Sequence, residues 1–543
     1  MSRPNPAILF GFFVALIVAI CGASLAKGGL YLGKHEGDML HLADIVLRMA
    51  AGAVPHQDFM TPIGILAFWP LVEFVQWGFG IGMSVLLAQM AFSVLILPAL
   101  FWASYSRLDG LAAYLFGAFV IVLVTALVHG EGQSSISVSM HYNRWAWAVS
   151  FVVLILAMMP GRPSDNATID GLFIGTGMFV LMMIKVTYFG AFALPLLVAL
   201  VVRRAYPTLL IALATGLGLM ALTTFLMGLS FWTGYLGDLL IVAASDARPY
   251  PSESFQRVIG APEYLGGSLL LLFTVIALRR SGFMNEGLVL LLLMPGFFYV
   301  TYQNFGNDPQ WMFFLVIVLM AHRPEAGHRF EFGTDMRNVI NIAAAFGVAL
   351  VSVSFVNMSY SSLRHLVEKE EDFTEFFPRS EQHDDLFADR LRSLRVDQRG
   401  PFLAPGTVLD EYQDIEEALE PTIFQGETLP SCAVELGMLA WFDAVVQDLE
   451  QAGYAGNGQT VFAADFLPSF WLFGGFAPLE GAAPWYYGGL PGFENADYLI
   501  VPTCALALES RATILEAVED SGVTVEEVRR TPLYILYSIP KAA

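Results

Sequence analysis

Long apolar runs alternate with short polar segments from the start of the chain to about residue 360. The first run, residues 7–26, has the length that an α-helix needs to cross a bilayer, and no small-residue cleavage pattern follows it. Ten further runs have the same character. We therefore expect eleven transmembrane helices, the first of them uncleaved, at residues 7–26, 82–104, 110–128, 145–160, 168–183, 187–202, 207–228, 262–279, 286–301, 309–321 and 338–356.

A twelfth apolar segment, residues 63–80, is interrupted by Pro70, Glu73 and Gln76 and reads as a half-inserted helix. The arginines of the loops support this interpretation. If the segment does not cross, they fall on the side of the N-terminus, which the positive-inside rule then assigns to the cytoplasm. The C-terminus then lies on the opposite, outer side. The arginines concerned are Arg107, Arg162, Arg203, Arg204, Arg279, Arg280, Arg323, Arg329 and Arg337.

A short amphipathic stretch follows the first apolar run, from about Asp38 to Ala51. The polar residues Asp38, His41, Asp44 and Arg48 recur at a spacing of three or four, and apolar residues occupy the other side. This pattern predicts a helix that lies flat at the membrane surface. Asp38, at its start, could serve as the N-cap.

Composition divides the chain into two parts. Hydrophobic residues make up 56% of it and charged residues 14%, which excludes an ordinary soluble protein. From residue 361 onward there are 31 acidic and 11 basic residues, against 18 and 17 before it. We expect a transmembrane domain at residues 1–360 and an acidic outer-face domain at 361–543, and such acidity argues against nucleic acid or anionic lipid as its partner.

The acidic part has the pattern of a small α/β domain. Its helices are expected at residues 361–376, 382–395, 433–452 and 508–521, and its strands at 460–464, 498–502 and 533–537.

Cys432 and Cys504 could form a disulfide there if the domain faces an oxidising compartment, although two unpaired residues remain the alternative. Residues 466–493 are rich in aromatic residues, including Trp471, Trp485, Tyr486 and Tyr487. They either pack onto the domain or the bilayer surface, or contact a sugar or a lipid.

Carboxylates lie just beyond the first apolar run, at the expected membrane surface. Acidic residues in that position call for a structural or functional explanation. Glu36 has no evident structural role, whereas Asp38 could be the N-cap described above. Asp58 follows twenty residues later and is either a turn residue or a substrate contact.

Two cations lie on the expected outer side, against the positive-inside rule. Arg144 follows His141, Tyr142 and Asn143, and Lys185 precedes Tyr188 in a tight helical hairpin. A guanidinium suits phosphate, and charged groups at membrane depth are functional candidates. The alternative is an arginine that snorkels to the interface between two tryptophans.

A third outer segment is dense in amides: Gln303, Asn304, Asn307 and the acid Asp308. Amides and an acid bind hydroxyl-rich ligands well. A polar turn in which Asp308 and Pro309 start the next helix is the alternative.

Two phrases resemble motifs of the GT-C fold membrane glycosyltransferases, the class of polyprenyl-phosphate-sugar-dependent protein mannosyltransferases and aminoarabinose transferases. In that class an acidic pair follows the first membrane helix, and a phrase of the type Pro-Tyr-Arg-Asp-Phe-x-x-Pro leads into a partly inserted helix. His35 replaces the first acid of the pair, so Glu36 matches the second and Asp38 follows two residues on. The phrases here are His35-Glu36-Gly37-Asp38 and Pro55-His56-Gln57-Asp58-Phe59-Met60-Thr61-Pro62.

The resemblance implies a membrane glycosyltransferase that moves a sugar from a polyprenyl-phosphate donor to a hydroxyl of a glycan, lipid or protein acceptor by an inverting single displacement. Glu36 or Asp38 would be the catalytic base, and Arg144 with Lys185 would bind the donor phosphate. It also implies a bacterial inner-membrane protein with a periplasmic C-terminal domain. The remaining substrate-binding candidates are His35, Asp58, His141, Tyr142, Asn143, Tyr188, Gln303, Asn304, Asn307 and Asp308.

No spacing of histidines or cysteines predicts a zinc site, and no cofactor follows from the sequence, although carboxylates and amides suit a divalent cation. The alternative function is a polytopic transporter, or a polysaccharide polymerase or ligase, with a polar outer vestibule. Such a protein would be expected to show charged or broken helices at mid-membrane or repeat symmetry, and neither is evident.

Overall fold

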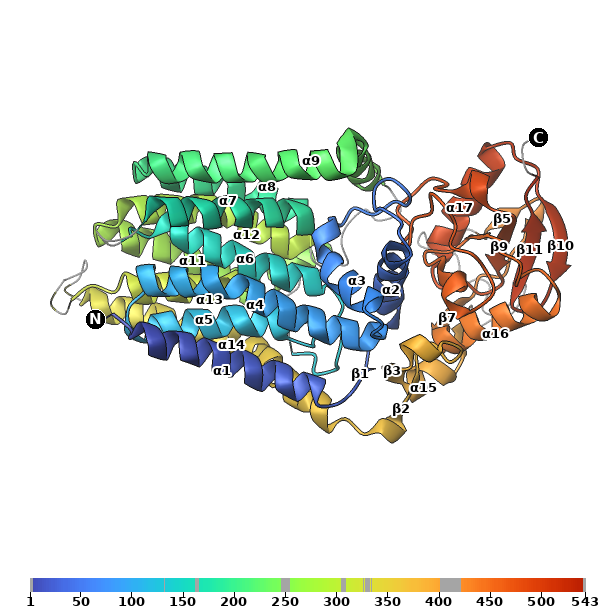
Figure 1. The fold of residues 1–543 in the computed structure, drawn as a ribbon, viewed down its shortest axis with the longest axis horizontal. Helices are drawn as coiled ribbons and strands as arrows, with labels where there is room; N and C mark the ends of the chain where they lie inside the picture. The colour runs from blue at the N-terminus through green and yellow to red at the C-terminus, as the bar shows by residue number, and fades with distance from the viewer. Residues whose placement is uncertain are drawn as a thin grey trace, which may run out of the picture.

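The computed structural model describes residues 3–130, 132–161, 166–245, 254–303, 309–325, 327, 333, 335–400 and 421–540. They form a bundle of long helices and a smaller domain that packs against one end of it (Figure 1). The N-terminus lies at the other end of the bundle. The expectation that the two ends of the chain lie on opposite sides agrees with this arrangement.

Each of the eleven expected spans corresponds to a helix of the bundle. Seven helices in the described ranges are long and apolar enough to cross a membrane, and three shorter ones are apolar. The chain is therefore a multi-pass membrane protein. The eleven helices that correspond to the expected spans are α1 (Pro6–Leu25), α4 (Ile81–Arg107), α5 (Gly110–Thr125), α6 (His141–Met158), α7 (Ala167–Ile184), α8 (Val186–Val202), α9 (Tyr206–Ala243), α11 (Pro262–Arg280), α12 (Met284–Gln303), α13 (Trp311–Ala321) and α14 (Met336–Val367), with α10 (Phe255–Gly260) a short piece before α11.

The segment 63–80 does not cross. It forms a 3₁₀ turn, η1 (Ile65–Ala67), and the eight-residue helix α3 (Trp69–Gln76). Eight residues of α-helix span about 12 Å, much less than the hydrocarbon core of about 30 Å. The structure places η1 and α3 at the end of the bundle that faces the smaller domain, together with α2 (Glu36–Ala50) (Figure 1).

Helix α9 is longer than the sequence predicts. The expected span ended at residue 228, and the next one began at residue 262. Instead the helix resumes after a break at Gly228, where φ is 80°, and runs on to Ala243. A positive φ strains any residue with a Cβ, which explains why a glycine stands at this break. The loop residues 246–253 lie outside the described residues.

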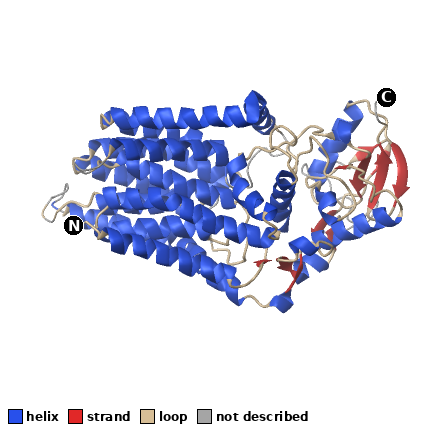
Figure 2. Ribbon diagram, viewed as in Figure 1, coloured by secondary structure: helices blue, strands red, loops and turns tan. Residues whose placement is uncertain are grey.

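The C-terminal domain is an α/β domain, as expected, built on a four-stranded sheet (Figure 2). The strand order is β10-β11-β9-β8, with β8 parallel to β9 and the other pairs antiparallel. The three expected strands correspond to β8, β9 and β11, whereas the charged strand β10 gave no apolar signal. The elements are β8 (Val461–Ala463), β9 (Tyr498–Pro502), β10 (Glu526–Arg530), β11 (Tyr534–Ser538), α16 (Met438–Gln451) and α17 (Leu508–Asp520).

Alternate residues of this sheet enter two different cores. Ile500 of β9 belongs to the large apolar cluster that continues into the membrane bundle, whereas Leu499 and Val501 belong to a second cluster under α17. The period of two along a strand produces this division. The domain therefore shares a continuous apolar core with the bundle.

The linker between the two parts was predicted incorrectly. Residues 361–376 and 382–395 were expected to be helices of the domain, but α14 carries the chain to Val367 and short strands follow. Polar, charged residues at helical spacing misled the prediction. The small elements of this region are β2 (Phe373–Glu375), β3 (Leu386–Asp389), α15 (Arg390–Leu394), β4 (Asp397–Arg399), β5 (Ile423–Phe424), β6 (Glu427–Thr428) and β7 (Ala433–Leu436).

A three-residue strand of the first outer loop, β1 (Leu30–Leu32), joins a sheet of the C-terminal part. It pairs in parallel with β3, with Leu30 opposite Leu386, in the order β1-β3-β2. Next to it, the Asp385 carboxylate accepts hydrogen bonds from the backbone N–H groups of Gly82 (3.0 Å) and Met83 (2.7 Å) at the start of α4. The linker is thus tied to the loop that carries the candidate carboxylates.

We expect a cysteine at Gln382 to react with an impermeant thiol reagent in intact cells and a cysteine at Asn285 to be protected. Both positions are exposed, and they lie at opposite ends of the bundle. The native background is low because Cys21 is buried and Cys432 is bonded to Cys504. Labelling at residue 285 with protection at residue 382 would reverse the orientation that the arginines indicate.

Candidate functional site

Helix α2 begins earlier than the sequence predicts and presents two acids in its first turn. Its N-cap is His35, in the left-handed conformation with φ 66°, so Glu36 and Asp38 are the first and third helical residues. The interpretation of Asp38 as the N-cap is therefore wrong. Both carboxylates lie where the helix dipole favours negative charge.

Glu36 is held by an arginine of the C-terminal domain. Arg392 of α15 donates from Nε to Glu36 Oε1 (2.6 Å) and from a terminal nitrogen to Oε2 (3.0 Å), and Glu36 is buried. These hydrogen bonds raise the pKa of Arg392 above its usual value. Both carboxylate oxygens of Glu36 are thus occupied by one guanidinium in a two-point ion pair.

The polar face of α2 is the docking surface of the C-terminal domain. Asp44 is fully buried and accepts from Arg48 (2.5 Å) and from the indole N–H of Trp471 (2.9 Å). Arg48 in turn donates to the carbonyl of Leu479 (2.6 Å). The polar side of this expected interfacial helix is therefore covered by protein, namely by residues 469–479.

A cavity of about 290 Å³ lies between α2 and the C-terminal domain. Glu36, Asp38 and Arg392 line it, and the aromatic side of its wall includes Trp485 and Phe466. We call it the carboxylate cavity. It brings the two candidate bases of the sequence together with an arginine and a tryptophan from residues more than 350 positions further along.

His35 also lines the carboxylate cavity, and it contacts Ser137 and His129, which precede α6. Its Nδ1 lies 2.9 Å from Ser137 Oγ, and its ring is 5.0 Å from the ring of His129. Burial lowers the pKa of His35 to about 4 and that of His129 to about 3. Both imidazoles are therefore neutral at pH 7 and bring no positive charge to the two acids.

A second and larger cavity, of about 970 Å³, lies among α8, α9 and α12. Its walls are mainly apolar and include Leu194, Leu239 and Leu291. We call it the membrane cavity. The polar or aromatic residues that line it as well include Tyr142, Lys185, Gln303 and Tyr487.

Lys185 sits in the break between α7 and α8, as the hairpin pattern predicted. Its ammonium donates to Asn143 Oδ1 (2.9 Å) and lies 5.4 Å from the centre of the Tyr142 ring. Lys185 is only partly buried. It therefore places a positive charge in the wall of a largely apolar cavity.

Arg144 has different surroundings from Lys185. It is buried in the first turn of α6 and donates to the carbonyls of Ser139 (3.2 Å), Ala126 (3.1 Å) and, at 3.5 Å, His129. It is not among the residues that line the membrane cavity. The phosphate clamp expected of Arg144 and Lys185 stays a prediction: Lys185 lines the membrane cavity, whereas Arg144 ties Ala126, His129 and Ser139 to α6.

Three other candidate residues make contacts with neighbouring backbone groups or core side chains. The carboxylate of exposed Asp58 accepts from the backbone N–H of Val54 (2.6 Å), as a turn residue does. Buried His141 bonds through Nε2 to the carbonyl of Ala67 (3.0 Å), and Tyr188 packs against Trp147 in the core. Of the amide-rich segment, Gln303 lines the membrane cavity, while Asn304, Asn307 and Asp308 lie outside the described residues.

Of the comparisons with known proteins, the one with solved structures gives matches. No family model matches the sequence, and no curated protein does. Two solved structures are similar, both of ArnT from Cupriavidus metallidurans, each covering 97% of this chain and 97% of that chain. The first is in the apo state (TM-score 0.42, 12% identity), and the second is bound to undecaprenyl phosphate (TM-score 0.43, 11% identity). We base the function on this chain's own residues.

The structure adds a buried pair that the sequence did not indicate. His56 Nδ1 lies 2.7 Å from Asp238 Oδ2, which also accepts from the backbone N–H of Thr61 (3.1 Å). The Tyr235 ring stacks on His56 at 4.4 Å. These contacts fix the second motif phrase to the outer part of α9, beyond its break. Only the unusual acid in an apolar run could have drawn attention to Asp238.

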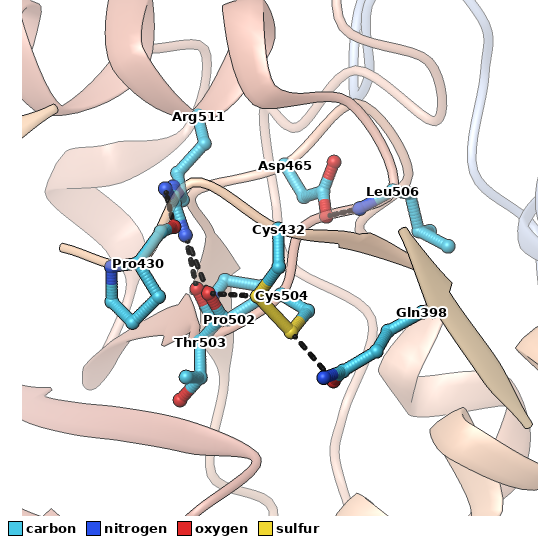
Figure 3. The surroundings of a disulfide bond; sticks show 9 residues. All are labelled: Gln398, Pro430, Cys432, Asp465, Pro502, Thr503, Cys504, Leu506 and Arg511. Carbon is cyan, nitrogen blue, oxygen red and sulfur yellow. Dashed lines mark hydrogen bonds between the residues drawn. A yellow bond between two sulfur atoms is a disulfide. The ribbon is translucent and has the colours of Figure 1, made fainter. Parts of the chain in front are cut away.

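Cys432 and Cys504 form a disulfide, one of the two possibilities left open by the sequence (Figure 3). Each cysteine precedes a residue of the carboxylate cavity wall by two positions, namely Val434 and Leu506. The Asp465 carboxylate accepts from the backbone N–H of Leu506 (2.6 Å) on the same side. Burial raises the pKa of Asp465 to about 6. The disulfide thus braces two walls of the cavity.

In the ranges that the structure describes, no three His, Cys, Asp or Glu side chains gather as a bound metal ion requires.

Proposed function

We propose that this chain is a membrane glycosyltransferase that transfers a sugar from a polyprenyl-phosphate donor to an acceptor hydroxyl at the outer face of the membrane. One observation carries the proposal: the membrane cavity, with Lys185 in its wall, adjoins the carboxylate cavity at residues 485–487. Trp485 lines the carboxylate cavity and Tyr487 the membrane cavity. Residues two apart have Cα atoms at most about 7 Å apart, so one short segment contributes to the walls of both cavities.

The membrane cavity suits a lipid phosphate. Its volume of about 970 Å³ is at the upper end for small-molecule sites, and its apolar walls would take isoprene units. An ammonium in the wall of such a cavity attracts a phosphate strongly because water is partly excluded there. Lys185 is our candidate for the donor-phosphate contact, and Tyr142 and Gln303 line the same cavity.

The carboxylate cavity supplies a base. In a single displacement the acceptor oxygen forms a bond to the anomeric carbon while the bond from that carbon to the phosphate oxygen breaks. The acceptor's hydroxyl proton passes to a carboxylate, and the polyprenyl phosphate leaves with the electron pair. Inversion requires attack from the side opposite the leaving phosphate, and a base in one cavity with a cation in the next can satisfy this.

Of the two acids, Asp38 is the better candidate for the base. Both oxygens of Glu36 accept hydrogen bonds from Arg392 at 2.6 and 3.0 Å, so proton transfer to Glu36 would have to break a two-point ion pair. Asp38 lies two residues further along the same turn and lines the same cavity. We assign Asp38 as the base and Glu36 as the residue that binds Arg392.

A transfer assay tests the proposal. Purified protein is given undecaprenyl phosphate carrying radiolabelled mannose, glucose or aminoarabinose, together with membrane extract as the source of acceptor. We expect one donor to lose its label to an acceptor with inverted anomeric configuration, and the Asp38→Asn variant to be inactive. Failure to bind undecaprenyl phosphate, with no turnover of any of these donors, would contradict the proposal.

A further inference from the structure

The aromatic segment of the C-terminal domain is placed at the meeting of the two cavities. We call residues 485–487 the aromatic strap. Trp485 and Tyr487 line different cavities, while Tyr486 between them is buried and bonds through its backbone N–H to the carbonyl of Phe466 (2.9 Å). The strap is thus anchored at its middle and presents one ring to each side.

Trp485 is held in place by two rings. The ring of His41, from α2, lies 5.3 Å away, and that of Phe466 lies 5.0 Å away, both in edge-to-face arrangement. Such pairs are the favoured geometry of aromatic contacts. Trp485 is half-buried, so part of its surface remains available to the carboxylate cavity. A fixed, partly open indole is suited to bind a ligand with little loss of conformational entropy.

The cavity chemistry fits a sugar ring. One face of a pyranose carries C–H groups that pack on an aromatic surface, while its edge carries hydroxyls that donate to carboxylates and accept from guanidinium. Trp485 provides the apolar surface, and Asp38 and Arg392 provide the polar partners. A volume of about 290 Å³ is at the lower limit of ligand sites, which suits one monosaccharide unit.

We propose that the carboxylate cavity binds the sugar of the donor and that Trp485 is the surface on which this sugar stacks. The inference rests on the proposed function and adds to it the location of the transferred sugar. It gives the C-terminal domain a direct part in the site, because the domain contributes both Trp485 and Arg392.

Binding of two related lipids tests this inference apart from catalysis. Affinities are measured for undecaprenyl phosphate and for undecaprenyl-phosphate-linked mannose, glucose and aminoarabinose on the full-length protein. We expect the parent to bind at least one sugar-bearing lipid more tightly than undecaprenyl phosphate. Trp485→Ala should weaken the affinity for that lipid by about tenfold and leave the affinity for undecaprenyl phosphate unchanged. Trp485→Phe should lose less affinity for the sugar-bearing lipid because an aromatic ring remains.

Tyr486→Phe is the matched control. The Tyr486 side chain is buried in the strap, and its hydroxyl has no hydrogen-bond partner among the residues that the structure describes. Losing this hydroxyl should leave the affinity unchanged and should not lower the melting temperature. If Trp485→Ala keeps the parent's preference for the sugar-bearing lipid, the stacking role is wrong. If the parent binds undecaprenyl phosphate but no sugar-bearing lipid more tightly, the sugar subsite is wrong and the lipid site stands. If the parent binds none of the four lipids, the proposed function itself fails, and the inference with it.

Discussion

Asp38→Asn is expected to lower sugar transfer by about 10² to 10⁴-fold while the protein remains folded, because a positioned base contributes on that scale. Asparagine has the same shape and loses only the charge in the first turn of α2. That charge is worth about 0.3 to 1 kcal/mol against the helix dipole. Turnover of labelled donor by the purified variant is the measurement, with monodisperse detergent extraction as the check on folding.

Glu36→Gln is the matched control for Asp38→Asn, since it removes a neighbouring charge of the same cavity. Its expected effect is on stability, by about 1 kcal/mol, because the Arg392 partner is 36% exposed and solvent screens the lost pair. Residual transfer well above that of Asp38→Asn would agree with the assignment. If a folded Glu36→Gln protein is dead and Asp38→Asn is active, then Glu36 is the base.

Lys185→Ala is expected to weaken the binding of undecaprenyl phosphate by about ten- to a hundredfold, the usual loss for a charge-assisted hydrogen bond of about 1.5 to 3 kcal/mol. The reason is that the lysine places its ammonium in the wall of an otherwise mainly apolar cavity. Equilibrium binding of the lipid in detergent is the measurement. Lys185→Arg, which keeps the charge, should retain most of the affinity.

Arg144→Met provides the contrast for Lys185. Arg144 is buried and donates to three backbone carbonyls, so its loss removes these hydrogen bonds and should lower the melting temperature. Lipid affinity per folded molecule should not change. Equal affinity of the parent and the Lys185→Ala variant would remove Lys185 from the site, whereas a specific loss in a stable Arg144→Met protein would restore Arg144 as a phosphate contact.

The sequence predicted the membrane part well because a span needs about 20 apolar residues, and such runs are visible without tertiary information. The half-inserted segment 63–80 was also predicted from the sequence. The local signals were Pro70 and Glu73, and the distribution of arginines along the chain supported them. The end of α9 could not be predicted in this way. Gly228 indicates a helix end whether or not the helix resumes after it.

The site was predicted only in part. Glu36, Asp38 and Lys185 stood out as charges at the ends of apolar runs. Arg392 did not, because its role depends on contact with a residue 356 positions earlier, and no local pattern records such a pairing. Arg144 shows the opposite difficulty: the sequence shows an unusual charge, but only the fold shows that its terminal nitrogens donate to backbone carbonyls.

Photo-crosslinking of a polyprenyl-phosphate analogue tests the central claim most directly. A photoreactive group on the first isoprene unit of undecaprenyl phosphate should label α8 and α12 near Leu194 and Leu291, which line the membrane cavity. Excess undecaprenyl phosphate should compete, and Lys185→Ala should reduce the yield. Labelling confined to lipid-facing residues such as Phe225 of α9, equal in the parent and in Lys185→Ala, would contradict a donor site in this cavity.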